Sequence, residues 1–227
     1  MRIVTYNIRG GLGLDGRRSI GRVAETLRAL RPDVVCFQEV HQRTPWGGLT
    51  DQPRRLGRLL AMRFVFQRTI DLGFGGYGIG IATRLPVRSV ARHALPGGAE
   101  GRGALQAELE TPDGAVRVFC THWGLDPEER DRQAALLARL VRSAGGPTTV
   151  CGDLNAGPHD GCVRGILEGA GLCDADAERD RPTFPGGAPT RRIDYILFTP
   201  ALRAERVDVG DSRASDHLPL AADLLRA

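Results

Sequence analysis

Short apolar runs recur along the whole 227-residue chain, and they constrain its fold most strongly. Runs rich in β-branched and aromatic residues, bounded by turn residues, predict strands. They cover residues 2–6, 33–37, 64–68, 80–83, 105–109, 116–120, 148–151, 193–198 and 218–223. The runs that contain Cys36, Cys120 and Cys151 are almost continuously apolar, as is typical of strands covered on both faces. The pattern therefore predicts sheets that other layers bury.

Two segments between these runs predict helices. Ser19 can cap the first, whose apolar residues share one face until Pro32 ends it. Asp126 can cap the second, which starts at Pro127, carries an apolar stripe and ends at Gly145. Weaker helical patterns cover residues 52–60 and 160–167. Because helices lie between strands and no linker divides the chain, the sequence predicts one α/β domain over residues 1–227.

The composition excludes several classes of protein. Hydrophobic residues make up 41% and charged residues 26%, which excludes a disordered or coiled-coil chain. No apolar run approaches the roughly 20 residues of a membrane helix, so no integral membrane segment is expected. The N-terminal segment lacks the apolar stretch of a signal peptide, and the five cysteines form no CxxC pair. We therefore expect a cytoplasmic protein with reduced, buried thiols.

All 31 basic residues other than histidine are arginines, and the net charge is +4. A basic surface suits partners that carry phosphate. The arginines are scattered along the chain, however, so an ordinary solvated surface and a nucleic-acid stripe both stay open.

Several apolar runs meet a residue that can bind metal or move protons. These residues are Asn7, Glu39, His122, Asp153 with Asn155, Asp194, and Asp216 with His217. Each alone has an ordinary interpretation as a turn residue, a solvated strand end or a surface ion pair. In α/β proteins, however, ligands bind where strand ends and loops meet. Their joint occurrence predicts that they converge in one site.

The chemistry that such a group suits is metal-assisted hydrolysis. Mg²⁺ takes oxygen ligands and keeps several waters, and Mn²⁺ accepts the same oxygens. Glu39 is the natural primary ligand, with Asn7 and Asp216 beside it. Zinc is the alternative, but the chain has no HxH, HExxH or CxxC spacing to support it.

The remaining polar residues suit proton transfer and charge stabilisation. Asp194 can orient the imidazole of His217. Asp153 could hold or deprotonate an attacking water, and Asn155 could position a phosphate oxygen. His122 would stabilise charge on the phosphoryl group.

The chain resembles the endonuclease/exonuclease/phosphatase superfamily, which includes DNases, exonuclease III-type enzymes and neutral sphingomyelinases. The motifs TYNI, FQEV, THWGL, GDLNAGP, TFPGGAPTRRIDYIL and SDHLPL occur in the family order, from Thr5 to Leu220. The resemblance implies a four-layer α/β sandwich, with two central mixed sheets flanked by helices. It also implies hydrolysis of phosphate esters with Mg²⁺ or Mn²⁺.

The resemblance also implies roles for individual residues. Asn7 and Glu39 match the family's metal-site residues, and Asp216 matches the acid before the family's histidine. His122, Asp153, Asn155, Asp194 and His217 match its catalytic positions. Arg102 resembles an arginine that starts a strand in small members, so we expect it to contact phosphate.

Some positions depart from the family pattern. Arg9 stands where AP endonucleases usually carry a second acid, and Ile79 replaces a common asparagine. Asp71 is the only candidate acid to partner His122, and a weak one. These departures, with the short chain, argue against repair of abasic sites.

The leading hypothesis is a metal-dependent phosphoesterase, with a nuclease acting on DNA or RNA favoured over other diesterases. The alternatives are a lipid-headgroup or small-molecule phosphodiesterase, a phosphatase, or a catalytically inactive binding module of the same fold. A monomer is expected. An enzyme acting on lipids should carry an exposed apolar loop beside the site. Trp46 and Phe74 are the candidate aromatics, and stacking on DNA bases or packing in the fold explains them equally well.

Overall fold

Two mixed six-stranded sheets pack face to face in the computed structural model, which describes residues 1–98 and 100–227. The first sheet has the order β11-β12-β1-β2-β4-β3. Its strands are β1 (Arg2–Asn7), β2 (Val34–Gln42), β3 (Arg63–Asp71), β4 (Gly76–Thr83), β11 (Leu202–Val209) and β12 (Leu220–Arg226). The second sheet has the order β5-β6-β7-β8-β10-β9. Its strands are β5 (Val87–Leu95), β6 (Arg102–Thr111), β7 (Gly114–His122), β8 (Thr148–Asp153), β9 (Cys173–Asp174) and β10 (Asp194–Phe198).

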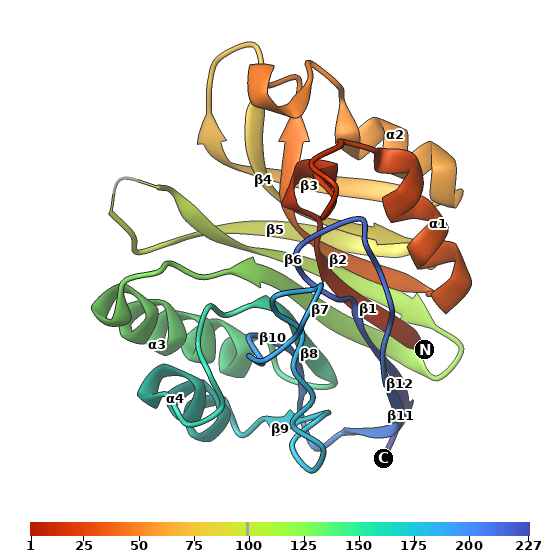
Figure 1. Ribbon diagram of the computed structural model, residues 1–227. Helices are drawn as coiled ribbons and strands as arrows, with labels where there is room; N and C mark the ends of the chain where they lie inside the picture. Colours follow the sequence, from red (N-terminus) through yellow and green to blue (C-terminus); the bar gives the residue numbers. More distant parts are fainter. Residues whose placement is uncertain (99) are drawn as a thin grey trace.

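Helices cover the outer face of each sheet (Figure 1). Helices α1 (Ile20–Leu30) and α2 (Gln52–Leu60) pack on the first sheet, and α3 (Pro127–Ala144) and α4 (Gly161–Ala170) pack on the second. Two short 3-10 turns, η1 (Arg9–Gly11) and η2 (Pro45–Gly47), follow β1 and β2. The four-layer α/β sandwich expected from the sequence is confirmed. None of the described helices is both long and apolar enough to span a membrane.

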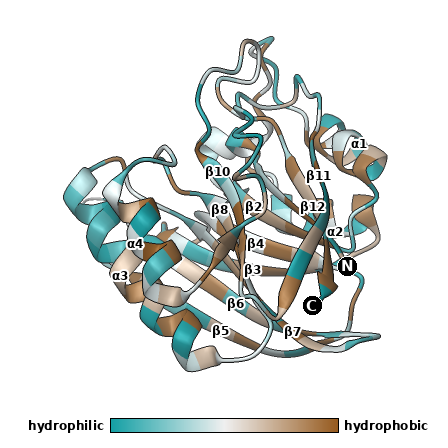
Figure 2. Ribbon diagram, turned by 90° about the horizontal axis from the view of Figure 1, so that it is seen from below, coloured by the Kyte–Doolittle hydropathy of each residue, from teal (hydrophilic) through white to brown (hydrophobic). Residues whose placement is uncertain are grey.

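Three apolar layers separate these elements, and Figure 2 shows hydrophobic residues concentrated on the central strands. The middle layer lies between the two sheets and contains Cys36, Cys120 and Cys151, all fully buried. Cys162 is also buried, and all of these are free thiols, as expected. Cys173 is exposed, because it lies on the two-residue edge strand β9.

Two parallel strand pairs bring the polar strand ends to one edge of the sandwich. β1 pairs in parallel with β2, and β7 pairs in parallel with β8. Each pair is joined by a crossover helix, α1 or α3. The Nδ2 of Asn7, at the end of β1, donates to the Oδ2 of Asp153, at the end of β8, over 3.0 Å. The polar ends of β1 and β8, from the two different sheets, therefore lie side by side.

The helices agree closely with the sequence prediction. The Ser19 hydroxyl accepts a hydrogen bond from the Arg22 N–H, and the Asp126 carboxylate accepts one from the Glu129 N–H. Both are N-caps, and they fix the first turns of α1 and α3.

Three strands escaped the sequence prediction: β5, β9 and β11. Each of them lies at the edge of a sheet and therefore pairs with only one neighbouring strand. Edge strands keep charged residues, such as Arg88 and Arg206, which interrupt the apolar pattern. A register shift between Ala204 and Arg206 breaks the alternation in β11 further.

Replacing a core leucine tests the packing between the sheets. Leu105 is fully buried on β6, so Leu105→Ala should lower the free energy of unfolding by about 2–5 kcal/mol. Leu125→Ala is the matched control, because that side chain is 74% exposed and its loss should change stability by about 0.5 kcal/mol or less. Urea denaturation measures both. Equal effects for the two variants would contradict the assigned core.

Candidate active site

Asp153 lies at the centre of the converged polar residues. It is the last residue of β8 and is 1% exposed. Its Oδ2 lies 3.0 Å from the Nδ2 of Asn7, 3.5 Å from the Nε2 of His122 and 3.7 Å from the Nε2 of His217. Its other oxygen accepts the N–H of Asn155 over 2.9 Å. One carboxylate therefore connects residues from β1, β7 and the segment before β12.

Glu39 reaches this centre through an irregularity in β2. The strand does not end near Phe37, as the sequence suggested, but continues to Gln42. Its pairing with β4 shifts register between Phe37 and Val40, and Glu39 takes a φ of 58°. Such a bulge redirects a side chain, and bulges are common beside active sites. Here it turns Glu39 toward Asn7, whose Nδ2 donates to the Oε1 of Glu39 over 3.0 Å.

Asp194 and His217 form a buried pair. Asp194 starts β10, pairs directly with Asp153 across the sheet and is fully buried. Its Oδ2 lies 2.9 Å from the Nδ1 of His217 and accepts the hydroxyl of Thr183 over 2.6 Å. The ring of Phe184 packs against His217 with 4.9 Å between the centroids. These contacts fix the imidazole with its Nε2 directed toward Asp153.

His122 and Asn155 form the other side of the site. Asn155 adopts a left-handed φ of 49°, and its Nδ2 donates to the backbone oxygen of Trp123 over 2.9 Å. The same amide lies 3.2 Å from the Nε2 of His122. Burial, with the charges of Arg102 and His217, holds the pKa of His122 well below its ordinary value. The contact between His122 and Asp153 is therefore not an ion pair.

Asp216 lies at the solvent side of the site, where the side chain of Arg9 contacts it over 3.3 Å. Ser215 positions this segment, because its hydroxyl donates to the backbone oxygen of Asn7 over 2.8 Å. Arg9 thus places a cation where AP endonucleases usually carry an acid.

Arg102, the first residue of β6, is buried and forms an ion pair with Glu100 over 2.7 Å. Asp71, the weak candidate partner for His122, is 66% exposed and pairs with Arg68 instead. That interpretation of Asp71 was wrong, because Asp71 is the last residue of β3 and lies exposed at the surface.

The donor set fits a divalent cation with hard, oxygen-seeking character. The side-chain amide of Asn7 donates hydrogen bonds to both Glu39 and Asp153 and so links the two carboxylates. The Oδ1 of Asp194 is buried without a hydrogen-bond partner among the described residues. Ligand atoms of Asp153, Asp194 and His217 all lie within 4.8 Å of one another. Carboxylates this close repel one another unless a proton or cation compensates them.

The amide of Asn7 is oriented by the backbone. Its Oδ1 accepts the N–H of Arg9 over 3.1 Å, so its nitrogen faces the two carboxylates. In this arrangement Asn7 positions Glu39 and Asp153, and it would have to turn its amide to offer oxygen to a metal.

Burial shifts the pKa values of the central groups. Burial, reinforced by the charge of Asp194, raises the pKa of Asp153 to about 7. Burial also raises the pKa of Glu39, although the hydrogen bond from Asn7 opposes it. Burial alone would lower the pKa of His217, but the charge and hydrogen bond of Asp194 prevail and raise it to about 10. Without metal, His217 is therefore protonated at neutral pH, where Asp153 is partly protonated as well.

These shifts predict how the stability of the metal-free protein depends on pH. The native state binds protons more tightly than the unfolded chain at Asp153 up to about pH 7, and at His217 between about pH 6.5 and 10. The free energy of unfolding in EDTA should therefore fall from pH 6.5 to pH 9, by at most about 1.4 kcal/mol per pH unit for each proton.

Urea denaturation at several pH values measures this slope, and His217→Gln is the matched variant. Its slope above pH 7 should be shallower, because the variant cannot hold that proton. A stability that rises with pH in the wild type would contradict the assigned protonation states.

The sequence placed most of the site residues but missed several supporting ones. Asn7, Glu39, Asp153, Asn155, His122, Asp194 and His217 come together as expected, with Asp216 and Arg102 beside them. Thr183, Phe184 and Ser215 lie inside the quoted motifs, yet no residue type among them suggested a role. Their contribution depends on contacts with Asp194, His217 and Asn7 that only the fold supplies.

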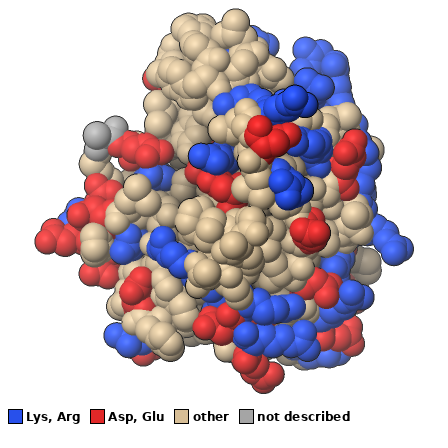
Figure 3. All heavy atoms as spheres, viewed as in Figure 1, with Lys and Arg blue, Asp and Glu red and all other residues tan. Residues whose placement is uncertain are grey.

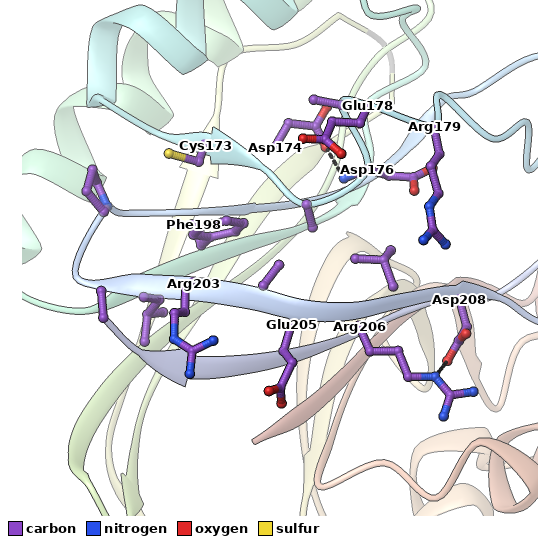
Figure 4. Close-up of a pocket in the computed structure, with 17 residues that line it drawn as sticks. Cys173, Asp174, Asp176, Glu178, Arg179, Phe198, Arg203, Glu205, Arg206 and Asp208 are labelled. Atoms are coloured by element: carbon purple, nitrogen blue, oxygen red, sulfur yellow. Dashed lines mark hydrogen bonds and ion pairs between the residues drawn. The ribbon is translucent and has the colours of Figure 1, made fainter.

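A separate groove lies far from this site (Figure 4). It has a volume of about 830 Å³ and lies between β9 and β11, at the opposite end of β10 from Asp194. Half of its charged lining residues are paired, since Asp174 contacts Arg192, Asp176 contacts Arg181, and Arg206 contacts Asp208. The groove therefore does not offer the convergent polar groups that surround Asp153.

Comparison with known proteins agrees with this fold. The model of the endonuclease/exonuclease/phosphatase family matches residues 4–217, and the chain belongs to this family. Members of the family are hydrolases that act on phosphoester bonds.

Three relatives show how widely this similarity extends. An uncharacterised protein of Escherichia coli K12, YbhP, is 29% identical over 98% of this chain and 95% of its own length. The crystal structure of an endonuclease/exonuclease/phosphatase from Beutenbergia cavernae has a TM-score of 0.85 and 27% identity, over 100% of this chain and 72% of that one. The mannosyl-6-phosphatase of Bacteroides thetaiotaomicron has a TM-score of 0.84 at 18% identity, over 99% of both chains, and shows the shared fold.

Proposed function

We propose that this chain is a Mg²⁺- or Mn²⁺-dependent phosphodiesterase. The observation that carries the proposal is the buried Asp153 carboxylate, on which Asn7, His122 and His217 converge within 3.7 Å. Enzymes of this family typically depend on a divalent metal. The carboxylates of Glu39 and Asp216 would hold the ion, together with the oxygen of Asn7 once its amide has turned. The ion would supply Lewis-acid stabilisation of phosphoryl charge.

The chain's own residues activate the water and stabilise the charge on the phosphoryl group. Asp153, with its raised pKa, orients the attacking water and accepts its proton. His217, held by Asp194, presents a positive charge to the phosphoryl oxygens. Asn155 and His122, which lie 3.2 Å apart, contact a phosphate oxygen. The buried guanidinium of Arg102 adds a positive charge beside them.

The substrate class is tested by a hydrolysis panel. It contains abasic and plain duplex DNA, single-stranded DNA, RNA, bis-p-nitrophenyl phosphate, sphingomyelin and a phosphomonoester, each with Mg²⁺, Mn²⁺ or EDTA. Metal-dependent cleavage of a diester supports the proposal. The substrate that is cleaved fastest identifies whether the enzyme acts on nucleic acid, lipid or a small molecule.

The panel also separates the alternatives. A nuclease should lose activity steeply as salt rises, because phosphate contacts release counterions. A preference for the phosphomonoester would indicate a phosphatase. If no substrate of the panel is hydrolysed, the alternative of a catalytically inactive binding module is favoured.

A further inference from the structure

The exposed large apolar side chains gather at the catalytic edge of the sandwich. Among the described residues they are Trp46, Leu49, Phe74 and Leu125, with exposed fractions between 55% and 74%. Single exposed apolar residues are normal when scattered over a surface. Here all four lie in loops that leave the strands near the catalytic residues. We call these four residues the apolar rim.

The strand register places two of these loops next to one another, and the third lies at the same edge on the second sheet. Gln42, the end of β2, pairs with Gly76, the start of β4, so the loop after β2 and the β3–β4 turn are adjacent. β2 runs three residues past Glu39, which carries both loops about 10 Å beyond that carboxylate. Leu125 follows His122 by three residues, after β7 ends on the second sheet.

The loop after β2 is built to hold Trp46 outward. The Thr44 hydroxyl accepts the N–H of Gly47 over 3.0 Å and lies 2.9 Å from the Nδ1 of the buried His41. Pro45 starts the η2 turn, and Gly48 closes it in the left-handed region with a φ of 70°. These contacts fix the backbone on both sides of an exposed indole, instead of letting it fold onto the core.

Basic residues lie beside the part of the rim that follows β2, whereas Leu125 on the second sheet is followed by the exposed Asp126 and Glu128. Residues 1–84 contain 14 arginines against 6 acidic residues, whereas residues 85–227 contain 17 against 21. Arg43, Arg54 and Arg55 are exposed in the loop and helix that follow β2. Figure 3 shows an uncharged lobe at the top, where Figure 1 draws η2 and the β3–β4 turn, with basic side chains and some acidic ones beside it over α1 and α2.

We propose that the apolar rim and its flanking arginines dock the protein on an anionic phospholipid membrane. The catalytic residues would then act on a phosphoester presented at that surface. This inference deepens the proposed function, and rests on it for the identity of the reaction. Docking itself depends only on the rim.

The composition of the rim favours a lipid surface over a nucleic acid strand. Strand binding relies on aromatic rings that stack with bases. Leu49 and Leu125 offer no such ring, whereas leucine, tryptophan and phenylalanine beside basic residues are typical of interfacial membrane binding. The arginine excess complements anionic headgroups.

Tryptophan fluorescence and vesicle sedimentation test the docking. The chain has two tryptophans, and Trp123 is fully buried, so a change on binding reports Trp46. With vesicles of phosphatidylcholine and phosphatidylglycerol, we expect co-sedimentation and a shift of emission to shorter wavelength. Vesicles of phosphatidylcholine alone should bind more weakly.

Two sets of variants locate the contact. Trp46→Ser with Phe74→Ser should weaken partitioning by about tenfold for each side chain removed. Arg43→Ala with Arg55→Ala should weaken binding to anionic vesicles. The matched control, Arg203→Ala with Arg206→Ala on β11, removes the same charge away from the rim and should not. Circular dichroism checks that each variant is folded.

Three outcomes would overturn the inference. These are no vesicle binding by the wild type, binding that ignores the rim variants, and a Trp46-dependent interaction with single-stranded DNA in place of vesicles. Hydrolysis of soluble bis-p-nitrophenyl phosphate is measured on the same wild-type protein. Cleavage without docking contradicts only this inference, and docking without cleavage contradicts only the proposed function.

Discussion

Replacing His217 with alanine should lower turnover of a phosphodiester by about 10²- to 10⁴-fold, the range expected for a lost acid–base or charge-stabilising group. The imidazole lies 3.7 Å from Asp153 and is held by Asp194 over 2.9 Å. Its removal leaves Asp194 buried without its cationic partner and takes a positive charge from the reaction centre. Steady-state kinetics with saturating Mg²⁺ or Mn²⁺ measures the effect, which should fall mainly on kcat.

His93→Ala is the control for this variant. His93 lies on the edge strand β5 and contacts Gln106 over 3.0 Å, outside the proposed machinery. It should retain turnover within a few-fold of the wild type. A His217→Ala enzyme that keeps near wild-type kcat, while remaining folded, would contradict the assigned role of His217.

Replacing Glu39 with glutamine should raise the metal concentration needed for half-maximal activity by about 100-fold or more. Outer-shell substitutions alone cost about 10- to 100-fold in metal affinity, and a direct ligand should cost at least as much as the upper value. Glutamine keeps the size of the side chain and its contact with Asn7, so the change isolates the negative charge. Titration of activity with Mg²⁺ and with Mn²⁺ measures the shift.

Glu128→Gln is the matched control, since that side chain is 87% exposed on α3. It removes the same charge and should leave the metal titration unchanged. If Glu39→Gln has the same metal dependence as the wild type, Glu39 is not a ligand and the ion would have to be held elsewhere among the carboxylates.

The central strands of this fold can be predicted from sequence because two layers cover them. The runs that contain Cys36, Cys120 and Cys151 lie between the sheets and helices, so nearly every side chain is apolar. The edge strands β5 and β11 cannot be recognised in this way, because solvent reaches one side and permits residues such as Arg92 and Glu205.

The position of Glu39 shows where sequence reasoning stops. The polar sequence after Phe37 suggested the end of a strand, but β4 continues to pair with the chain as far as Gln42. The bulge that redirects Glu39 depends on this partner strand, which lies about 40 residues later in the sequence. A local pattern therefore identified the right residue for a partly wrong structural reason.

The pairing of the candidate catalytic residues was easier to predict than the residues that hold them in place. Asp194 and His217 could be paired because an acid near an imidazole has a recognisable chemistry. The hydroxyl of Thr183, which donates to Asp194, has no such signal, since threonines are common in loops and strands. The ion pair between Arg9 and Asp216 depends equally on the way the loop before β12 returns to β1.

The most direct test of the proposed function is the rate of bis-p-nitrophenyl phosphate hydrolysis by protein stripped of metal and then resupplied. The proposal predicts no hydrolysis in EDTA, recovery with Mg²⁺ or Mn²⁺, and no recovery in the His217→Ala variant. Hydrolysis that persists in EDTA, or wild-type protein that stays inactive with either metal, would contradict a metal-dependent phosphodiesterase built on Glu39, Asp153 and His217.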